Sequence, residues 1–243
     1  MDYSCQQLAQ LIDYALLGQT VSERDVEEGC QAARRYGFAS VYVKPYEVAR
    51  AANLLLGSQV AVGTVISFPL GGDTTAGKLY LTEEAIRAGA RELDLATNLG
   101  ALKAGRWGYV EDETRAIVDL ARRSGALVKV ILEAPLLSRD EKLRLCRICA
   151  SVGAAYVKTS SGFGGVLATV EDVQLLRSVV GLGMGVKASG GVRTLDDLRQ
   201  LVDAGADRIG TSAAVPIVGQ CVANGGVRLV GRHLQGLGGL GLR

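Results

Sequence analysis

The chain has 243 residues, of which 48% are hydrophobic, and it carries 27 basic against 25 acidic side chains. This balance argues against a nucleic-acid-binding surface, which needs a local excess of basic residues. No apolar run approaches the roughly 20 residues of a membrane span. The start of the chain lacks a basic region followed by an apolar one, so no signal peptide is expected. We therefore expect a cytoplasmic protein that keeps its scattered cysteines reduced and binds neither nucleic acid nor membrane.

Short apolar runs alternate with amphipathic segments along the whole chain. Eight of these runs are candidate strands, at residues 11–16, 39–43, 60–66, 92–96, 127–133, 154–158, 184–188 and 206–210. Strands rich in Val, Ile and Leu that each precede a helix are typical of a parallel sheet covered by helices. Eight such units in about 240 residues predict an α/β fold of the closed (β/α)8 (TIM) barrel type.

Helix signals between the runs support this reading. Ser22 followed by Asp25 resembles a capping box, and the helix that it begins is expected to end at Gly37. Thr194 and Gly205 bracket a second helix in the same way. The pair "CRIC" at residues 146–149 lies in a segment with helical periodicity. We interpret it as two small residues on one helix face rather than a redox or metal pair.

The sequence is expected to form one domain at residues 1–220, followed by a glycine-rich, mobile tail at residues 221–243. Its single histidine, His233, lies in that tail. Zinc hydrolases, zinc-dependent aldolases and Ser-His-Asp enzymes need an imidazole in the body of the fold. The chemistry is therefore expected to use lysines, carboxylates and hydroxyls. Neither a metal nor another cofactor is predicted.

In a (β/α)8 barrel the active site lies at the carboxyl ends of the strands. Polar groups that should converge there are Asp13, Lys44, Asp94, Glu133, Lys158 and Lys187. Lys158 and Lys187 end adjacent predicted strands. An ordinary lysine has a pKa near 10.4, but an apolar wall and a neighbouring cation lower it. A neutral lysine can attack a carbonyl to form an imine, with Asp94 moving a proton through water.

Structural alternatives stay open for each of these groups. A rim lysine can contact a phosphate or simply be solvated. Asp94 can cap a loop, and Glu133 is interpreted as a structural partner of a rim lysine.

Two glycine-rich loops follow the seventh and eighth predicted strands. Barrels of this type hold phosphate in those two loops, at a helix N-terminus. Gly190 and Gly191 would allow close backbone approach, while Gly210, Thr211 and Ser212 offer amides and hydroxyls. The alternative is that the glycines only make tight turns.

Seven motifs together resemble deoxyribose-phosphate aldolases: "YGFASVYVKP", "VGTVISFPLGG", "ELDLATNLGALKAG", "VKVILEAPLL", "VKTSSGF", "GVKASGGVRT" and "RIGTSA". They stand in the family's order over residues 11–218. The resemblance implies a metal-independent class I aldolase of deoxyribose phosphate breakdown. It would cleave 2-deoxy-D-ribose 5-phosphate reversibly to acetaldehyde and D-glyceraldehyde 3-phosphate.

Carried over to this sequence, the motifs make Lys158 the Schiff-base nucleophile, Lys187 the group that depresses its pKa, and Asp94 the proton relay. The substrate contacts that they imply are Asp13, Thr159, Gly190, Gly191, Gly210, Thr211 and Ser212.

The sequence also departs from the family pattern. Tyr14 and Ala15 stand where members often have histidine and threonine, and Tyr42 stands where many have cysteine. Lys44, Ala134 and Pro135 are further departures. Three other readings remain: a class I aldolase for another phosphorylated sugar, a catalytically silent sugar-phosphate-binding barrel, and a phosphosugar isomerase. A homo-oligomer such as a dimer is also expected.

Overall fold

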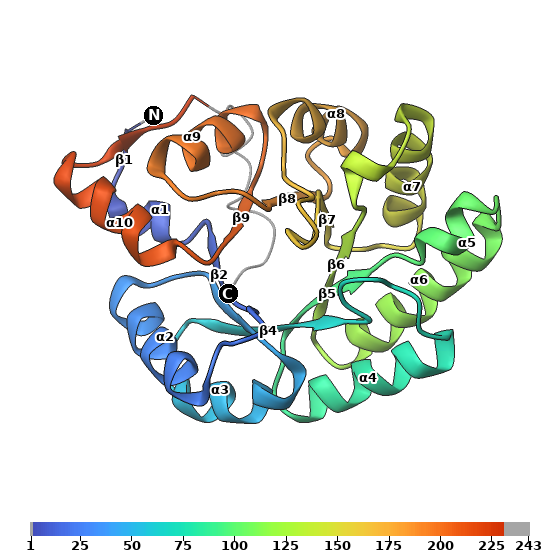
Figure 1. Ribbon diagram of the computed structural model, residues 1–243, viewed down its shortest axis with the longest axis horizontal. Helices are drawn as coiled ribbons and strands as arrows, with labels where there is room; N and C mark the ends of the chain where they lie inside the picture. The colour runs from blue at the N-terminus through green and yellow to red at the C-terminus, as the bar shows by residue number, and fades with distance from the viewer. Residues whose placement is uncertain (1, 231–243) are drawn as a thin grey trace.

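The computed structural model describes residues 2–230, and within them eight parallel strands close into a barrel (Figure 1). The strands are β2 (Ile12–Leu16), β3 (Ser40–Val43), β4 (Ala61–Ile66), β5 (Glu92–Ala96), β6 (Leu127–Ile131), β7 (Tyr156–Lys158), β8 (Gly185–Ser189) and β9 (Arg208–Thr211). They pair in chain order, and β9 closes the ring against β2. The predicted (β/α)8 barrel is confirmed, with each strand within three residues of its expected bounds.

Helices surround this ring in Figure 1. They are α1 (Cys5–Ala9), α2 (Glu23–Tyr36), α3 (Val48–Leu54), α4 (Thr75–Arg87), α5 (Leu99–Lys103), α6 (Trp107–Arg123), α7 (Arg139–Ser151), α8 (Val170–Val180), α9 (Leu195–Ala204) and α10 (Ala214–Ala223), with 3-10 turns η1 (Pro45–Glu47) and η2 (Ala134–Leu136). Each buries one apolar face; α6, for example, packs Val110, Ile117 and Ala121 into the core. Burial of these faces provides the main hydrophobic stabilisation of the barrel.

The predicted helix ends are confirmed. Ser22 and Asp25 form the capping box of α2, in which the Ser22 amide donates to Asp25 Oδ2 at 2.7 Å. Thr194 caps α9 in the same way through Asp197. After α9 the chain turns at Gly205, whose φ of 122° is one that other residues rarely adopt. The two cysteines of "CRIC" are buried, unbonded thiols in α7, as interpreted.

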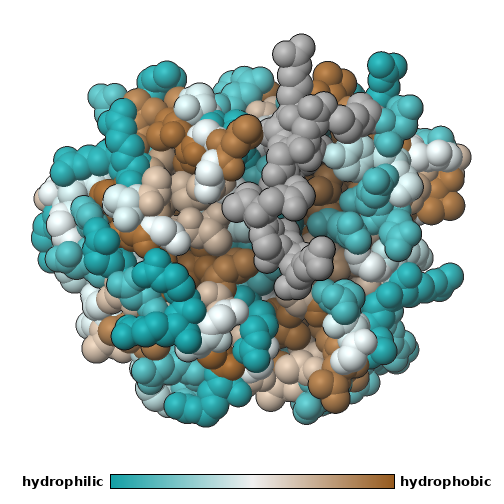
Figure 2. Space-filling view, turned by 180° about the vertical axis from the view of Figure 1, so that it is seen from behind, coloured by the Kyte–Doolittle hydropathy of each residue, from teal (hydrophilic) through white to brown (hydrophobic). Residues whose placement is uncertain are grey.

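Hydrophilic residues fill most of the outline of the face shown in Figure 2, with apolar residues between them. Within residues 2–230, none of the helices combines the length and the apolar character that crossing a bilayer requires.

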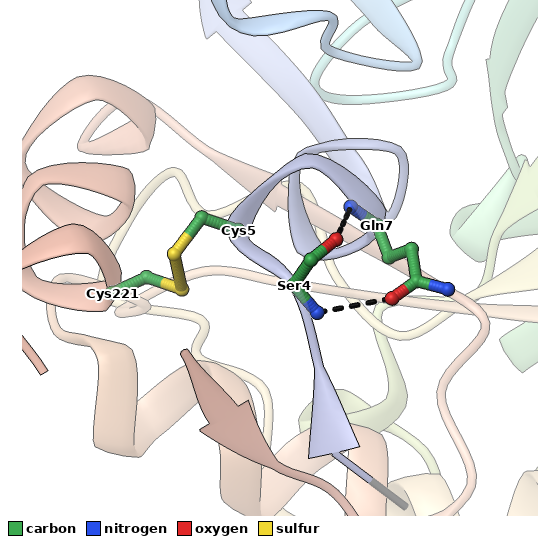
Figure 3. Close-up of a disulfide and its surroundings, with 4 residues drawn as sticks. All are labelled: Ser4, Cys5, Gln7 and Cys221. Carbon is green, nitrogen blue, oxygen red and sulfur yellow. Dashed lines mark hydrogen bonds between the residues drawn. A yellow bond between two sulfur atoms is a disulfide. The ribbon is translucent and has the colours of Figure 1, made fainter. Parts of the chain in front are cut away.

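The two ends of the described chain are joined to each other. Strand β1 (Asp2–Tyr3) pairs antiparallel with β10 (Val227–Arg228), beside α10 in Figure 1. A disulfide connects Cys5 at the start of α1 to Cys221 in α10, with the two Cα atoms 5.7 Å apart (Figure 3). In the same turn, Ser4 and Gln7 form the capping box of α1.

Two expectations change as a result. The prediction that all cysteines are reduced is wrong for this pair, since 216 positions separate two cysteines that the fold brings together. The expected domain boundary after residue 220 falls inside α10, and the chain remains paired as far as β10. The rest of the expected tail, including His233, lies outside the described residues.

We expect loss of the disulfide to lower the melting temperature. A cross-link that closes so long a loop restricts the unfolded chain and typically contributes about 2–4 kcal/mol. In a chain of this size, that corresponds to a decrease of roughly 5–10 °C for Cys5→Ser, measured by differential scanning calorimetry. Dithiothreitol should lower the melting temperature of the unmodified protein equally and leave the variant unchanged. No effect of the reductant on either protein would contradict the assignment.

Candidate active site

The barrel interior carries charge where a barrel core is usually apolar. Alternate residues of a strand face the same side, and this alternation points seven charged side chains inward: Asp13, Glu92, Asp94, Lys129, Lys158, Lys187 and Arg208. Each is at most 4% exposed. Buried charges on this scale require partners, and the seven groups provide them for one another.

Lys158 and Lys187 are register partners on β7 and β8, as the sequence suggested. Both Nζ atoms donate to the same oxygen, Asp94 Oδ2, each at 2.8 Å. The second oxygen, Asp94 Oδ1, is buried and makes no hydrogen bond within the described residues. The two lysines therefore share one carboxylate oxygen, Asp94 Oδ2, and the other oxygen, Oδ1, remains free to accept a hydrogen bond.

A second layer of ion pairs lies beneath these three groups. Lys187 Nζ is also 2.7 Å from Asp13 Oδ2, and Lys129 Nζ approaches the same oxygen at 2.7 Å. Arg208 pairs with Asp13 and lies 3.2 Å from Glu92 Oε1. Asp13 is thus the counter-ion shared by three cations.

Sequence reasoning missed Lys129, Arg208 and Glu92. A signal was present, because each is a charged residue in a short predicted strand that consists mainly of apolar residues.

These contacts set the protonation of the site. Burial alone would raise the pKa of Asp94, but the ammonium groups of Lys158 and Lys187 outweigh it and lower the pKa to about 2. Burial likewise favours a neutral Asp13, yet Lys129, Lys187 and Arg208 hold the pKa of that carboxyl well below its usual range. Both carboxylates are therefore ionised at neutral pH.

Of the four interior cations, Lys158 has the fewest carboxylate partners. Burial lowers the pKa of Lys158; Asp94 opposes this, and the charge of Lys187 lowers the pKa further. Lys158 contacts one carboxylate, whereas Lys187 contacts two. Among the seven interior groups, four are cations and three are carboxylates, so a neutral Lys158 leaves the interior balanced. Lys158 is thus the amine best placed to act as a nucleophile.

The ion pairs form the floor of a cavity of about 290 Å³ at the carboxyl ends of the strands. Nine of the ten predicted site residues line it: Asp13, Asp94, Lys158, Lys187, Gly190, Gly191, Gly210, Thr211 and Ser212. The tenth, Thr159, lies behind the wall, where its Oγ1 accepts a hydrogen bond from the Ser189 amide at 3.2 Å. Thr159 therefore ties β7 to β8 instead of facing the cavity.

Two other residues expected at the mouth also lie outside the cavity lining. Lys44 Nζ donates to the carbonyl of Val21 at 2.8 Å. Glu133 Oε1 accepts from the Ser161 amide at 2.6 Å and has no lysine partner within the described residues, so the interpretation of Glu133 as a partner of a rim lysine is wrong. It anchors the loop that follows Lys158.

The loops after β8 and β9 frame one end of the cavity. Gly190 has a φ of 97°, and a Cβ there would lie 2.7 Å from the carbonyl oxygen of Val166, so only glycine fits. Thr211 Oγ1 is occupied, donating to the Val192 carbonyl and accepting from the Ala213 amide. Ser212 is exposed beside the start of α10. This end therefore combines close backbone approach with a helix N-terminus, a combination suited to an anion.

Comparison with known proteins supports the same reading. Residues 8–231 match the profile of the DeoC/LacD family aldolases. The chain belongs to this family. A deoxyribose-phosphate aldolase of a Geobacillus species is 49% identical over 217 residues, which cover 89% of this chain and 97% of that protein.

Solved structures agree. A Coccidioides immitis protein assigned to the deoxyribose-phosphate aldolases superposes with a TM-score of 0.87 at 38% identity, covering 90% of this chain and 87% of that one. A tetrameric deoxyribose phosphate aldolase from Aeropyrum pernix gives 0.84 at 38% identity, with 89% and 92% covered.

We expect Lys187→Met to move the reactivity of Lys158 to higher pH. A neighbouring cation disfavours a second one, so its removal raises the pKa of Lys158 and reduces the neutral amine at any given pH. A small aldehyde can be trapped on Lys158 with cyanoborohydride and quantified by peptide mass at a series of pH values. The acid limb of this pH profile should move to higher pH by about one unit or more. Lys187→Arg keeps the charge and should stay near the unmodified protein. An unmoved limb in Lys187→Met would contradict this assignment.

Proposed function

We propose that the chain is a class I deoxyribose-phosphate aldolase that reversibly cleaves 2-deoxy-D-ribose 5-phosphate to acetaldehyde and D-glyceraldehyde 3-phosphate. The observation that carries the proposal is the shared carboxylate: Lys158 and Lys187 both donate to Asp94 Oδ2, and only Lys158 lacks a second counter-ion. Relatives named for this activity match nearly the whole chain.

The reaction begins with the neutral Lys158 amine, which attacks the C1 aldehyde of the open-chain sugar. Uptake of one proton from water and loss of one water molecule then give a protonated imine, whose positive charge can accept an electron pair. Asp94 Oδ1, the free acceptor of the site, is positioned to move protons through water. The oxygen on C3 loses its proton as the C2–C3 bond breaks.

The electron pair of the broken bond enters the imine and gives an enamine on Lys158, while C3 becomes the aldehyde of glyceraldehyde 3-phosphate. Protonation of the enamine at C2 and hydrolysis of the resulting imine release acetaldehyde and restore the amine. Lys187 remains a cation throughout, since two carboxylates hold it.

The phosphate end accounts for the substrate class. The cavity is at the lower end of the volumes typical of small-ligand sites. Its glycine-lined end lies beside the start of α10, where amides and a helix dipole favour an anion. A small phosphorylated sugar fits both features. A class I aldolase for another phosphorylated sugar is the alternative, and a substrate panel separates the two.

A cytoplasmic location and a homo-oligomer, such as a dimer, are proposed with this function. Disulfides are rare in that compartment but do occur in intracellular proteins of hyperthermophiles. The Cys5–Cys221 bridge is therefore compatible with the cytoplasm.

Borohydride reduction in the presence of 2-deoxyribose 5-phosphate tests the mechanism. We expect a stable adduct on Lys158, located by digestion and mass spectrometry, because reduction converts the imine to a secondary amine. Lys158→Ala should lose the adduct and nearly all turnover. Lys103→Ala, at an exposed lysine paired with Glu141, should keep both. Sugar-phosphate binding without label would instead support a silent binding barrel, and full turnover in Lys158→Ala would support an isomerase.

Ser212→Asp tests the phosphate end. A carboxylate there would repel the phosphate and raise the KM for the phosphorylated sugar by about tenfold or more. Cleavage of unphosphorylated 2-deoxyribose should be unaffected in the same assay. Ser212→Ala, which adds no charge, should change the KM far less. An equal loss with both sugars in Ser212→Asp would place the phosphate elsewhere.

A further inference from the structure

Tyr42 is a bulky aromatic residue at the floor of the catalytic cavity. It lies in β3 and is 1% exposed. The ring face lies under the ammonium of Lys187, with Nζ 3.7 Å from the ring centroid. Lys129 Nζ is farther away, at 4.9 Å. This is the closest of the cation–ring contacts in the described part of the chain.

The barrel makes room for this ring on both sides. On β4 the register partner of Tyr42 is Gly63, where a Cβ would lie 2.5 Å from the ring. On β2 the register partner is Ala15, another small residue. The large residue is thus flanked by two small ones, and its ring is held flat against Lys187.

The phenol remains neutral in this position. Its hydroxyl lies 3.5 Å from Glu92 Oε2, to which it donates. Burial and the negative charges of Asp94, Glu92 and Asp13 raise the pKa of Tyr42 well above its usual range. The ring therefore acts on Lys187 through its π face and not as a tyrosinate. A desolvated cation over an aromatic face is stabilised more than one exposed to water.

Lys187 faces a mixed set of charges. It contacts Asp13 on β2, Tyr42 on β3 and Asp94 on β5. Its register partners are Lys158 on β7 and Arg208 on β9, and Lys129 on β6 shares Asp13 with it. These last three are cations that oppose its charge. Lys158 has the ring of Phe68 at 5.6 Å, a longer and weaker contact. The aromatic environment is therefore unequal between the two lysines.

We propose that Tyr42 is a positioning residue for imine formation: its ring face keeps Lys187 charged, so that Lys158 is the lysine that gives up its proton. This inference rests on the proposed function, since it assigns Tyr42 a part in the lysine chemistry.

The test varies the ring without changing its shape. Position 42 is replaced by phenylalanine and then by phenylalanines with increasing numbers of fluorines, which weaken the π face. For each protein, the pH dependence of Lys158 trapping with 2-deoxyribose 5-phosphate and borohydride is measured. Tyr42→Phe should keep the acid limb, because the π face remains. Fluorination should move the limb stepwise to higher pH, and Tyr42→Leu should move it by about half to one pH unit.

Tyr156 provides the matched control. It is another buried tyrosine of the barrel, but the cations above its ring are Lys129 and Arg208, at 5.3 and 5.9 Å. The same fluorinated series at position 156 should leave the acid limb of Lys158 in place. Circular dichroism and melting temperature establish that each variant folds.

The outcomes separate this inference from the proposed function. An acid limb that stays fixed through the series at position 42, or that moves as far in Tyr42→Phe as in Tyr42→Leu, would overturn the role of the π face. An equal shift in the series at position 156 would overturn it as well. If the unmodified protein gains no label on Lys158, it is the aldolase function that fails.

Discussion

Two ammonium groups and one carboxylate oxygen organise this molecule: Lys158 and Lys187 both donate to Asp94 Oδ2 inside the barrel, where each of the three residues is at most 3% exposed. Desolvating such groups costs several kcal/mol each, which their mutual attraction offsets only when the geometry is close. Apolar side chains in the same space would often be as stable or more so. The seven interior charges are therefore better explained by the reactivity they create than by stability.

In the proposed mechanism, the distribution of counter-charge determines which lysine reacts. Asp13 contacts Lys129, Lys187 and Arg208, so it anchors the cations below the cavity and leaves Lys158 with Asp94 alone. A nucleophilic amine must be neutral, whereas its neighbour must stay charged to keep it so. The two requirements fall on different residues, because Lys187 contacts both Asp13 and Asp94 whereas Lys158 contacts Asp94 alone. Asp13 contributes to the chemistry through the charge it compensates, even though it also reaches the cavity floor.

Sequence periodicity was sufficient to predict the barrel and the placement of Lys158 and Lys187 on adjacent strands. Strands bounded by glycine turns and capped helices have local signals, and Lys158 and Lys187 stood out because they lie at equivalent places on adjacent strands. What could not be read locally was pairing between distant residues. Thr159 follows Lys158 directly, yet its hydroxyl accepts a hydrogen bond from the amide of Ser189 on the neighbouring strand β8. Glu133 accepts a hydrogen bond from the backbone amide of Ser161, and no pattern of side chains predicts such a contact. Cys5 and Cys221 are brought together only because the barrel closes.

The packing around Tyr42 likewise depends on residues that are distant from it in the sequence. In the sequence, nothing links Tyr42, a large residue, to Ala15, a small one. The register of β2 and β3 places them side by side, and β4 adds Gly63 on the other flank. Because barrel interiors are close-packed, a ring of this size is tolerated only where its neighbours are small. The three positions therefore form one packing unit, which places the Tyr42 ring closer to the Lys187 ammonium than to that of Lys129.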